Sequence, residues 1–567
     1  MASGNTKYDS RNNCNAIIET ASNTLMTGCQ NTNIPNSITT IGNLAFNGCN
    51  GLTSIEIPNS VILIGYRAFD GCSNLTNIGI PNTVTRIKAN AFNGTAWYEN
   101  QPDGVVYAGS VAYKYKGTMP SETSITLKEG TSGITSDAFA GCTGLISIDI
   151  PNSVFNIGSG AFDWTKWYDN QPDGVIYAGL VAYSYKGYMP SGTSIILKEG
   201  TLGIGDYAFG SMEMKSGSNI NRDYRWDLVH IEIPNSVIHI GEGAFNMSRL
   251  TRIEIPNSVT HIDDYAFNYC TSLTSIEIGN SVIDIGDNAF YGCSGRIYCY
   301  GTTPPRCYND HTFSDYSATL HVPATSLASY FTTPVWCNFE NIVGDAVAPS
   351  GISISKDSVE IQLGEQLNLT ATVTPANASN KEIYWYSSDT NVATMDNGTV
   401  IANGIGECDI IAFCFGMRLV CHVSVFNRIS IEEQEAMVQP NHILTLTPTA
   451  PVMPEGFIAT SSDPSVAAVR VINERVQVVG IKEGTTTITV GSTDGTAVPA
   501  TCVVTVYTEP GDVNMDGFVN ISDVTDIIDY LLSGNVNNFK EANADLDGDG
   551  RVSIGDVTDL IDQLLGS

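Results

Sequence analysis

The chain has 567 residues, a formal net charge of −32 at pH 7 and 42% hydrophobic residues. This length is enough for several domains, and the acidic excess argues against nucleic acid, whose phosphates require Lys and Arg. No run of 18 apolar residues occurs, so we expect no membrane span.

An internal repeat dominates residues 30–295. The motif Ile-Pro-Asn-Ser/Thr begins at Ile34, Ile57 and Ile80, a period of 23 residues. Each unit has the pattern of a strand, a Pro-Asn turn, a short strand, an Ile-Gly bend and a turn that buries Phe. One unit cannot bury its own apolar face, so we expect stacked coils that form a rod-like solenoid. The Ala-Phe pair returns nine times, at Phe46, Phe69, Phe92, Phe139, Phe162, Phe209, Phe245, Phe267 and Phe290.

Five of the 14 cysteines occupy one repeat position, three residues after the Phe. We interpret them as buried thiols at a position where small residues stack. Disulfides between coils, such as Cys49–Cys72, are the alternative, and metal binding is less favoured because no Cys-x-x-Cys spacing occurs. The five are Cys49, Cys72, Cys142, Cys270 and Cys293.

The repeated frame Ile-Pro-Asn-Ser-Val-x-x-Ile-Gly-x-x-Ala-Phe-x-x-Cys resembles the BspA-like leucine-rich repeat family of bacterial surface proteins. The resemblance covers most of residues 14–345 and implies a role in adhesion to host or microbial surfaces. Insertions at 97–117 and 167–187 alternate apolar and polar residues like hairpins, and their Trp and Tyr residues are either hairpin core or sugar-stacking groups. Residues 296–345 are expected to cap the solenoid, which gives a domain over 1–345.

The solenoid also offers a candidate ligand face. Alternate strand residues point outward, and the position between the two isoleucines of each long strand is acidic in five coils. These residues form either a ligand-binding ladder or a solvated surface that keeps the solenoid soluble. They are Glu56, Asp149, Glu232, Glu254 and Glu277.

Residues 350–426 and 429–507 predict two β-sandwiches built from short alternating strands. The two segments align with each other and resemble bacterial immunoglobulin-like domains of group 2, although the second lacks a counterpart of Trp385. The resemblance implies spacer domains that hold a binding head away from its anchor.

Two calcium-type loops, offset by 33 residues, lie in the final segment, 509–567. Each has oxygen-bearing side chains at loop positions 1, 3, 5, 9 and 12, glycine at 6, and a backbone carbonyl at 7, as a hard cation with six to eight oxygen ligands requires. We predict two Ca2+ ions as cofactors, with position 9 acting through water; plain Asp/Asn/Gly turns are the alternative. The ligands are Asp512, Asn514, Asp516, Phe518, Asn520 and Asp523 in the first loop, and Asp545, Asp547, Asp549, Arg551, Ser553 and Asp556 in the second.

The apolar spacing after each loop predicts a helix with one apolar stripe, and Pro510 and Gly511 exclude a helix that enters the first loop. Loops with exiting helices only, and Asp at position 12, resemble the type I dockerin. This resemblance implies a cohesin-type domain on another protein as partner. Loop positions 10 and 11 and the exposed helix face would contact it, which selects Ile521, Ser522, Thr525, Asp529, Ile554, Gly555, Thr558 and Asp562.

The fold class is therefore mainly β: a leucine-rich-repeat solenoid, two β-sandwiches and a small all-α calcium-binding dockerin. We find no motif for catalysis and expect a secreted or cell-surface binding protein rather than an enzyme. A subunit of an extracellular polysaccharide-degrading assembly is the alternative, and a passive rod is a third. The first six residues lack a signal-peptide core, so we expect a fragment or mature form without its leader.

Overall fold

The computed structural model describes residues 5, 7–211, 227–396 and 398–566. The chain divides into two compact units. The first holds residues 1–353 with 372–383 and 413–418, and the second holds 354–371, 384–412 and 419–567. The division between the two units falls within the sandwich of residues 350–426. The bounds of the four domains expected from the sequence remain a prediction.

The repeats form a solenoid with two rows of parallel strands, in which one coil pairs with the next in the same register, as Ile253 does with Ile276. The N-terminal coil begins with the antiparallel strands β1 (Tyr8–Asp9), β2 (Ile17–Glu19) and β3 (Thr24–Thr27). The short-strand row consists of β4 (Thr40–Ile41), β6 (Leu63–Ile64), β8 (Arg86–Ile87), β12 (Gly133–Ile134), β14 (Asn156–Ile157), β18 (Gly203–Ile204), β20 (His239–Ile240), β22 (His261–Ile262), β24 (Asp284–Ile285) and β26 (Arg306–Cys307). The long-strand row consists of β5 (Ser54–Glu56), β7 (Asn77–Gly79), β11 (Thr123–Thr126), β13 (Leu145–Asp149), β17 (Thr193–Ile196), β19 (Leu228–Glu232), β21 (Arg252–Ile255), β23 (Ser275–Ile278), β25 (Arg296–Cys299), β27 (Thr319–His321) and β28 (Asn341–Val343).

The repeated phenylalanines stack along the solenoid core. Ring centroids of Phe46 and Phe69 lie 5.0 Å apart, and those of Phe267 and Phe290 lie 5.2 Å apart, with nearly parallel planes. All 14 cysteines are free thiols. Cys72, Cys270 and Cys293 are buried as predicted, and the Sγ of Cys72 lies 2.9 Å from the carbonyl oxygen of Phe46 one coil earlier. Cys49 and Cys142 are only half-buried, so full burial was wrong for these two.

Both insertions are hairpins, as predicted. β9 (Gly104–Ala108) pairs with β10 (Val111–Lys116), and β15 (Gly174–Ala178) pairs with β16 (Val181–Lys186). Each hairpin follows a single helical turn, α1 (Ala96–Glu99) or α2 (Lys166–Asp169). The Trp97 ring lies 4.9 Å from that of Phe92, so this aromatic residue completes the core beside the hairpin.

The C-terminal end of the solenoid is closed by aromatic residues, as expected of a cap. The helix α3 (Leu327–Thr332) and the turns η3 (Ala324–Ser326) and η4 (Trp336–Asn338) lie here. Trp336 is fully buried, and its indole N–H donates to the carbonyl of Pro305 at 2.7 Å.

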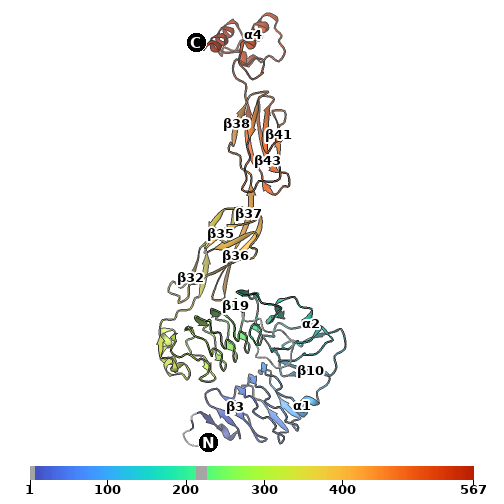
Figure 1. The fold of residues 1–567 in the computed structure, drawn as a ribbon, viewed down its shortest axis with the longest axis vertical. Helices are drawn as coiled ribbons and strands as arrows, with labels where there is room; N and C mark the ends of the chain where they lie inside the picture. The colour runs from blue at the N-terminus through green and yellow to red at the C-terminus, as the bar shows by residue number, and fades with distance from the viewer. Residues whose placement is uncertain (1–4, 6, 212–226, 397, 567) are drawn as a thin grey trace. The chain divides into compact units, whose positions relative to one another are not determined.

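The solenoid is not the straight rod that the period suggested, because it curls upon itself (Figure 1). Arg86 forms an ion pair with Asp263, which lies 177 residues further along the chain. At the ends of the curl, the Arg306 guanidinium donates to the carbonyl of Ser22 at 3.1 Å. The short-strand row therefore lines the inside of the curl. The rotation per coil depends on how the two faces pack, which a period does not specify.

Each sandwich packs two main sheets. The sheets around residues 351–428 use β29 (Gly351–Ile354), β30 (Ser358–Gln362), β31 (Gln366–Asn368), β32 (Ala371–Thr374), β33 (Tyr384–Ser387), β34 (Ala393–Asp396), β35 (Thr399–Ala402), β36 (Gly406–Cys414) and β37 (Met417–Arg428). The sheets around residues 435–506 use β38 (Glu435–Val438), β39 (Ile443–Leu446), β40 (Phe457–Ser461), β41 (Ala467–Ile472), β42 (Arg475–Gly480), β43 (Gly484–Ser492), β44 (Ala497–Val498) and β45 (Ala500–Val506).

The final segment is helical, with α4 (Ile521–Ser533), α5 (Glu541–Ala544) and α6 (Ile554–Leu565). No helix enters the first loop, as Pro510 and Gly511 predicted. The short helix α5 ends at Ala544, directly before the second loop, so the expectation of exiting helices only was wrong there. Its small core consists of Val513, Val524, Ile527, Ala544, Val557 and Leu560.

Candidate calcium and docking site

The first loop is already folded around its own carboxylates. Asp512 is fully buried, and its two oxygens accept the backbone N–H groups of Asp516 at 3.1 Å and Gly517 at 2.9 Å. Gly517 has a φ of +88°, which favours glycine and gives the sharp turn at position 6. Asp516 accepts the N–H of Phe518 at 2.9 Å, so the loop coils inward at each ligand position.

The second loop gathers three carboxylates into one cluster. One carboxylate oxygen each from Asp545, Asp547 and Asp549 lies within 4.8 Å of the others. The Oδ1 atom of Asp545 is buried and has no hydrogen-bond partner among the described residues. A cation bound here would satisfy that oxygen and neutralise the repulsion between the three charges. The residues therefore fit a Ca2+ ion.

The aspartate at position 12 of each loop also caps the helix that follows. Asp523 accepts the N–H groups of Val513 at 2.9 Å and Asn520 at 2.8 Å, and it closes a capping box at the start of α4. Asp556 does the same at α6, where Ser553 is the N-cap. Burial raises the pKa of both Asp512 and Asp523, because an ionised carboxylate is disfavoured away from water. A bound cation would reverse that effect.

The two helices leave half of each apolar stripe in solvent, and they do so symmetrically. Ile521 and its counterpart Ile554 are 70% and 71% exposed, and Leu532 and Leu565 are 81% and 75% exposed. Ile528, Leu531, Ile561 and Leu564 are also exposed, so the predicted stripes are only partly buried. Repeated exposure of large apolar side chains is typical of a surface that binds another protein.

The predicted partner-binding residues lie on this exposed side of the module. Seven of them are exposed, and Gly555 is half-buried. The hydroxyls of Thr525 and Thr558 both donate to the carbonyl four residues earlier, Ile521 and Ile554. The structure therefore presents the same set of groups twice, once on each loop and helix.

Residues beyond the module contact its first loop, which sequence reasoning did not find. The amide of Asn441 donates to the carbonyl of Met515 at 3.2 Å, and the His442 ring lies 4.8 Å from that of Phe518. Gln439 also donates to Glu509 at 2.9 Å. No equivalent contact is recorded at the second loop among the described residues, so the neighbouring sandwich makes the two loops unequal.

The predicted ligand face of the solenoid is not a continuous exposed ladder. Glu56 and Asp149 are exposed, but Glu232, Glu254 and Glu277 are 2%, 8% and 1% exposed, so their predicted exposure was wrong.

Two segments of the first unit cover Glu254. Glu254 accepts the Asn380 amide and the Phe415 N–H, each at 2.7 Å. Glu277 accepts the hydroxyl of Tyr300 at 2.8 Å and pairs with Arg252. The covering segments lie more than 100 residues further along the chain, so the local pattern carried no signal of them.

Comparison with known families agrees with this architecture. The family model of the BspA-type leucine-rich repeat region matches six copies over residues 17–103, 109–221 and 182–298. A bacterial Ig-like domain of group 2 matches residues 349–414, and a type I dockerin domain matches residues 510–565. The chain therefore carries BspA-type repeats, a group 2 Ig-like domain and a type I dockerin.

Individual relatives are distant or partial. An uncharacterized protein of Clostridium acetobutylicum is 33% identical over 172 residues, which cover 29% of this chain and 18% of that protein. The minor capsid protein of Enterobacteria phage T3 is 37% identical over 70 residues, covering 12% of this chain and 16% of the relative. The chain thus spans less than a fifth of these relatives.

Two solved structures of leucine-rich repeat proteins are similar to part of this chain. A leucine-rich repeat protein from Bacteroides ovatus is 21% identical, covers 59% of this chain and 95% of that one, and has a TM-score of 0.18. A leucine-rich cell surface protein from Faecalibacterium prausnitzii is 17% identical, with 60% and 94% coverage and a TM-score of 0.16.

The matched domains set coarse limits on chemistry and partners. Type I dockerin domains bind calcium and imply a cohesin partner. None of the matched domain types is catalytic. Within the described part of the chain, no helix combines the length and apolarity needed to cross a membrane.

Proposed function

We propose that this chain is a secreted or cell-surface binding protein that attaches through its C-terminal module to a cohesin-type domain when two Ca2+ ions are bound. The solenoid is the head that recognises a protein or glycan on a host or microbial surface, and the sandwiches are spacers. The observation that carries the proposal is the duplication. Two sets of calcium ligands organise two equivalent exposed apolar surfaces.

Calcium organises the docking surface because its ligands and the helix starts are the same residues. Asp512, Asn514, Asp516 and Asp523 with the carbonyl of Phe518 hold the first ion, and Asn520 acts through water. Asp545, Asp547, Asp549 and Asp556 with the carbonyl of Arg551 hold the second, with Ser553 acting through water. Asp523 and Asp556 cap α4 and α6, so loss of the ions releases the helices that carry Ile521 and Ile554.

The repeated presentation of two similar exposed surfaces supports two docking orientations related by a half-turn. Ile521, Ser522, Thr525 and Asp529 would contact the cohesin in one orientation, and Ile554, Gly555, Thr558 and Asp562 in the other. Gly555 lacks the hydroxyl of Ser522, which makes the two orientations slightly unequal.

The test is capture of the full chain by a panel of immobilised type I cohesin domains, with and without a calcium chelator. We expect binding to at least one cohesin in calcium and none after chelation. Leu532→Ser and Leu565→Ser should each weaken capture modestly, and the double variant should abolish it. Capture that persists in chelator, or that is undiminished in the double variant, contradicts the proposal. Ile405→Ser, at an exposed residue of the sandwich around 351–428, is the matched control.

The dockerin match also favours a second candidate, a subunit of an extracellular polysaccharide-degrading assembly. Incubating the full chain with soluble polysaccharides shows whether such a subunit is catalytic. Release of reducing sugar indicates a catalytic subunit, and retention of the polysaccharide without product indicates a binding subunit.

A further inference from the structure

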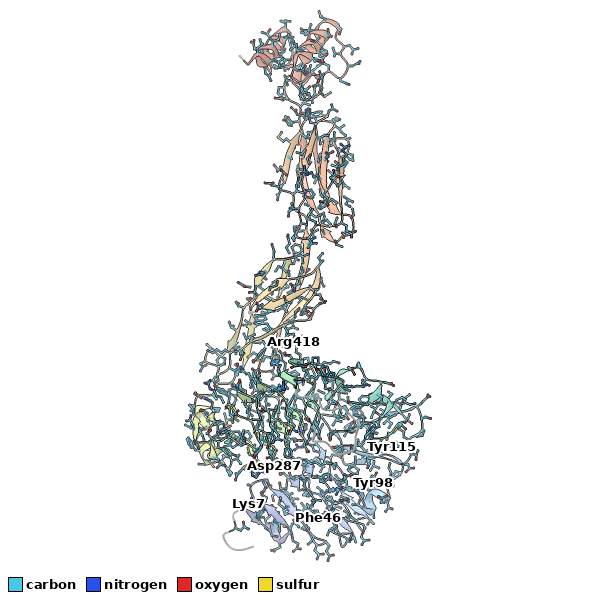
Figure 2. The ribbon with its side chains drawn as sticks, in the orientation of Figure 1. Lys7, Phe46, Tyr98, Tyr115, Asp287 and Arg418 are labelled. Atoms are coloured by element: carbon cyan, nitrogen blue, oxygen red, sulfur yellow. The ribbon has the colours of Figure 1, made fainter. Side chains whose placement is uncertain are left out.

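The inside of the curled solenoid contains a polar cavity of about 370 Å³ that belongs to neither predicted site. Its walls are the short-strand row and the turns that follow it, including Arg86, Asn156, Asp263 and Asp287. Asp287 is labelled among the solenoid side chains in Figure 2. The volume of the cavity falls within the range of small-molecule sites, about 300–1,000 Å³.

The charged groups at the base of the cavity are held rigidly. Asp263 pairs with Arg86 from the opposite side of the curl and lies 3.2 Å from Nε2 of the buried His239. Burial alone raises the pKa of Asp263, but Arg86 and His239 outweigh burial and hold it well below its usual range. Lys88 bridges the curl in the same way, 3.2 Å from Glu242 and paired with Asp264. These contacts fix the cavity walls in place.

Three buried polar atoms in the cavity wall lack hydrogen-bond partners among the described residues. They are the donor Nη2 of Arg86 and the acceptors Oδ1 of Asn156 and Oδ1 of Asp287. Arg86 is only 5% exposed, so bulk water does not solvate it freely. A buried polar group without a hydrogen-bond partner destabilises the folded state, so the cavity is built for an occupant that both accepts and donates hydrogen bonds.

Aromatic rings stand at the open side of the cavity. Tyr66 and Tyr265 line it and remain 39% and 37% exposed, so they mark its mouth. Burial raises the pKa of Tyr265, so its phenol stays neutral. A ring face beside a set of donors and acceptors suits a sugar, which has apolar C–H faces and polar hydroxyl edges.

The charge of the lining selects among sugars. Two lining groups are basic, Arg86 and Lys88, and six are acidic. Burial raises the pKa of Asp206 and of Glu242, and the four other acidic groups still outnumber the two basic ones. Anionic sugars and phosphate are therefore disfavoured. The acidic lining groups are Asp137, Asp206, Glu242, Asp263, Asp264 and Asp287.

We propose that this cavity binds a neutral saccharide unit at the end of a glycan. Arg86 and Asn156 hydrogen-bond its hydroxyls, and Tyr66 and Tyr265 cover its face. The inference deepens the proposed role of the solenoid as a recognition head and rests on that role.

The test uses the full chain in calcium and isothermal titration calorimetry. The probes are glucose, galactose, mannose, N-acetylglucosamine, cellobiose and maltose, with sialic acid and inorganic phosphate as anionic comparators. We expect saturable binding of at least one neutral sugar and none of either anion. Absence of binding by every neutral sugar, or preference for an anion, overturns the proposal.

Variants locate the sugar. Tyr66→Ala and Tyr265→Ala should each weaken binding roughly tenfold, as loss of one aromatic face predicts. Asn156→Leu removes an acceptor, fills space and should abolish binding. Tyr269→Ala is the matched control, because Tyr269 is 47% exposed and lies outside the cavity lining. Binding that survives Tyr66→Ala, Tyr265→Ala and Asn156→Leu in folded protein places the sugar elsewhere and overturns the proposal.

Cohesin capture of the same variants separates the two proposals. All four should dock in calcium as the unchanged chain does. An unchanged chain that docks in calcium but binds no neutral sugar removes only the cavity proposal. An unchanged chain that binds a neutral sugar but is not captured in calcium removes only the docking proposal.

Discussion

Carboxylates are concentrated in two regions of this molecule, and the negative charge is compensated differently in each region. In the solenoid, Glu254 and Glu277 are buried and receive donors from the protein itself: Asn380, the Phe415 N–H and Tyr300, with Arg252 beside them. In the second terminal loop, Asp545 keeps a buried oxygen that has no hydrogen-bond partner in the described part of the chain.

The two regions therefore represent two kinds of acidic cluster. A carboxylate that the chain supplies with donors is structural, whereas a carboxylate cluster left without them requires a cation from outside. We therefore expect the solenoid to be indifferent to calcium and the terminal module to depend on it.

Chelation should have the largest effect. Removing two ions at 100 times their dissociation constant costs about 2.7 kcal/mol each, more than the small core of the module is expected to hold. Hydrogen exchange of the full chain should show lost protection in α4 and α6. Protection in β21 and β23 should not change. Equal protection of α4 with and without chelator would refute the calcium role.

The second largest effect is expected from the removal of a structural carboxylate. Glu277→Gln leaves Arg252 without one of its buried partners and should lower the unfolding free energy of the solenoid by about 3 kcal/mol. Glu56→Gln, at an exposed position on the same strand row, should change it by less than about 0.5 kcal/mol. Urea unfolding of both variants measures the contrast, and equal losses would argue against distinct roles.

Asp545→Asn should remove one ion and leave the other. Calorimetric titration of calcium into the full chain should fall from two sites to one, with about 2.7 kcal/mol less stabilisation of the module at 100 times the dissociation constant. Asp529→Asn, an exposed non-ligand of the same module, should keep both sites. Two intact sites in the Asp545 variant would exclude it as a ligand.

The smallest effect is the pH dependence at Glu254. Burial, with Glu277 nearby, raises its pKa to about 7 from 4.5. A raised carboxyl pKa means that the folded state prefers the proton, so stability is greatest below about pH 4.5 and falls as the pH rises to about 7.

Exchange of the Phe415 amide, which donates to Glu254, reports this change locally. It should quicken between pH 4.5 and 7 beyond the intrinsic pH effect. Glu254→Gln should remove the excess, and an unchanged excess in that variant would place the titrating group elsewhere.

Much of this structure was predictable from the sequence, because short-range patterns determine it. The period of Phe46 and Phe69 predicted the stacked core, the insertions predicted hairpins, and ligand spacing predicted loops that coil around Asp512 and Asp545. The predictions that were wrong concern contacts between segments that lie far apart in the sequence. The burial of Glu254 needs Phe415, and the curl needs Arg86 to meet Asp263. No local pattern contains such partners.

The curl has a consequence for how this solenoid can change in length. Repeat proteins usually gain or lose a unit freely, because each unit touches only its neighbours. Here Arg86 reaches Asp263, and Arg306 reaches Ser22, so the circumference is closed by specific pairs. Duplication of one 23-residue coil between Arg86 and Asp263 would displace both pairs at once, so these pairs oppose a change in the number of coils.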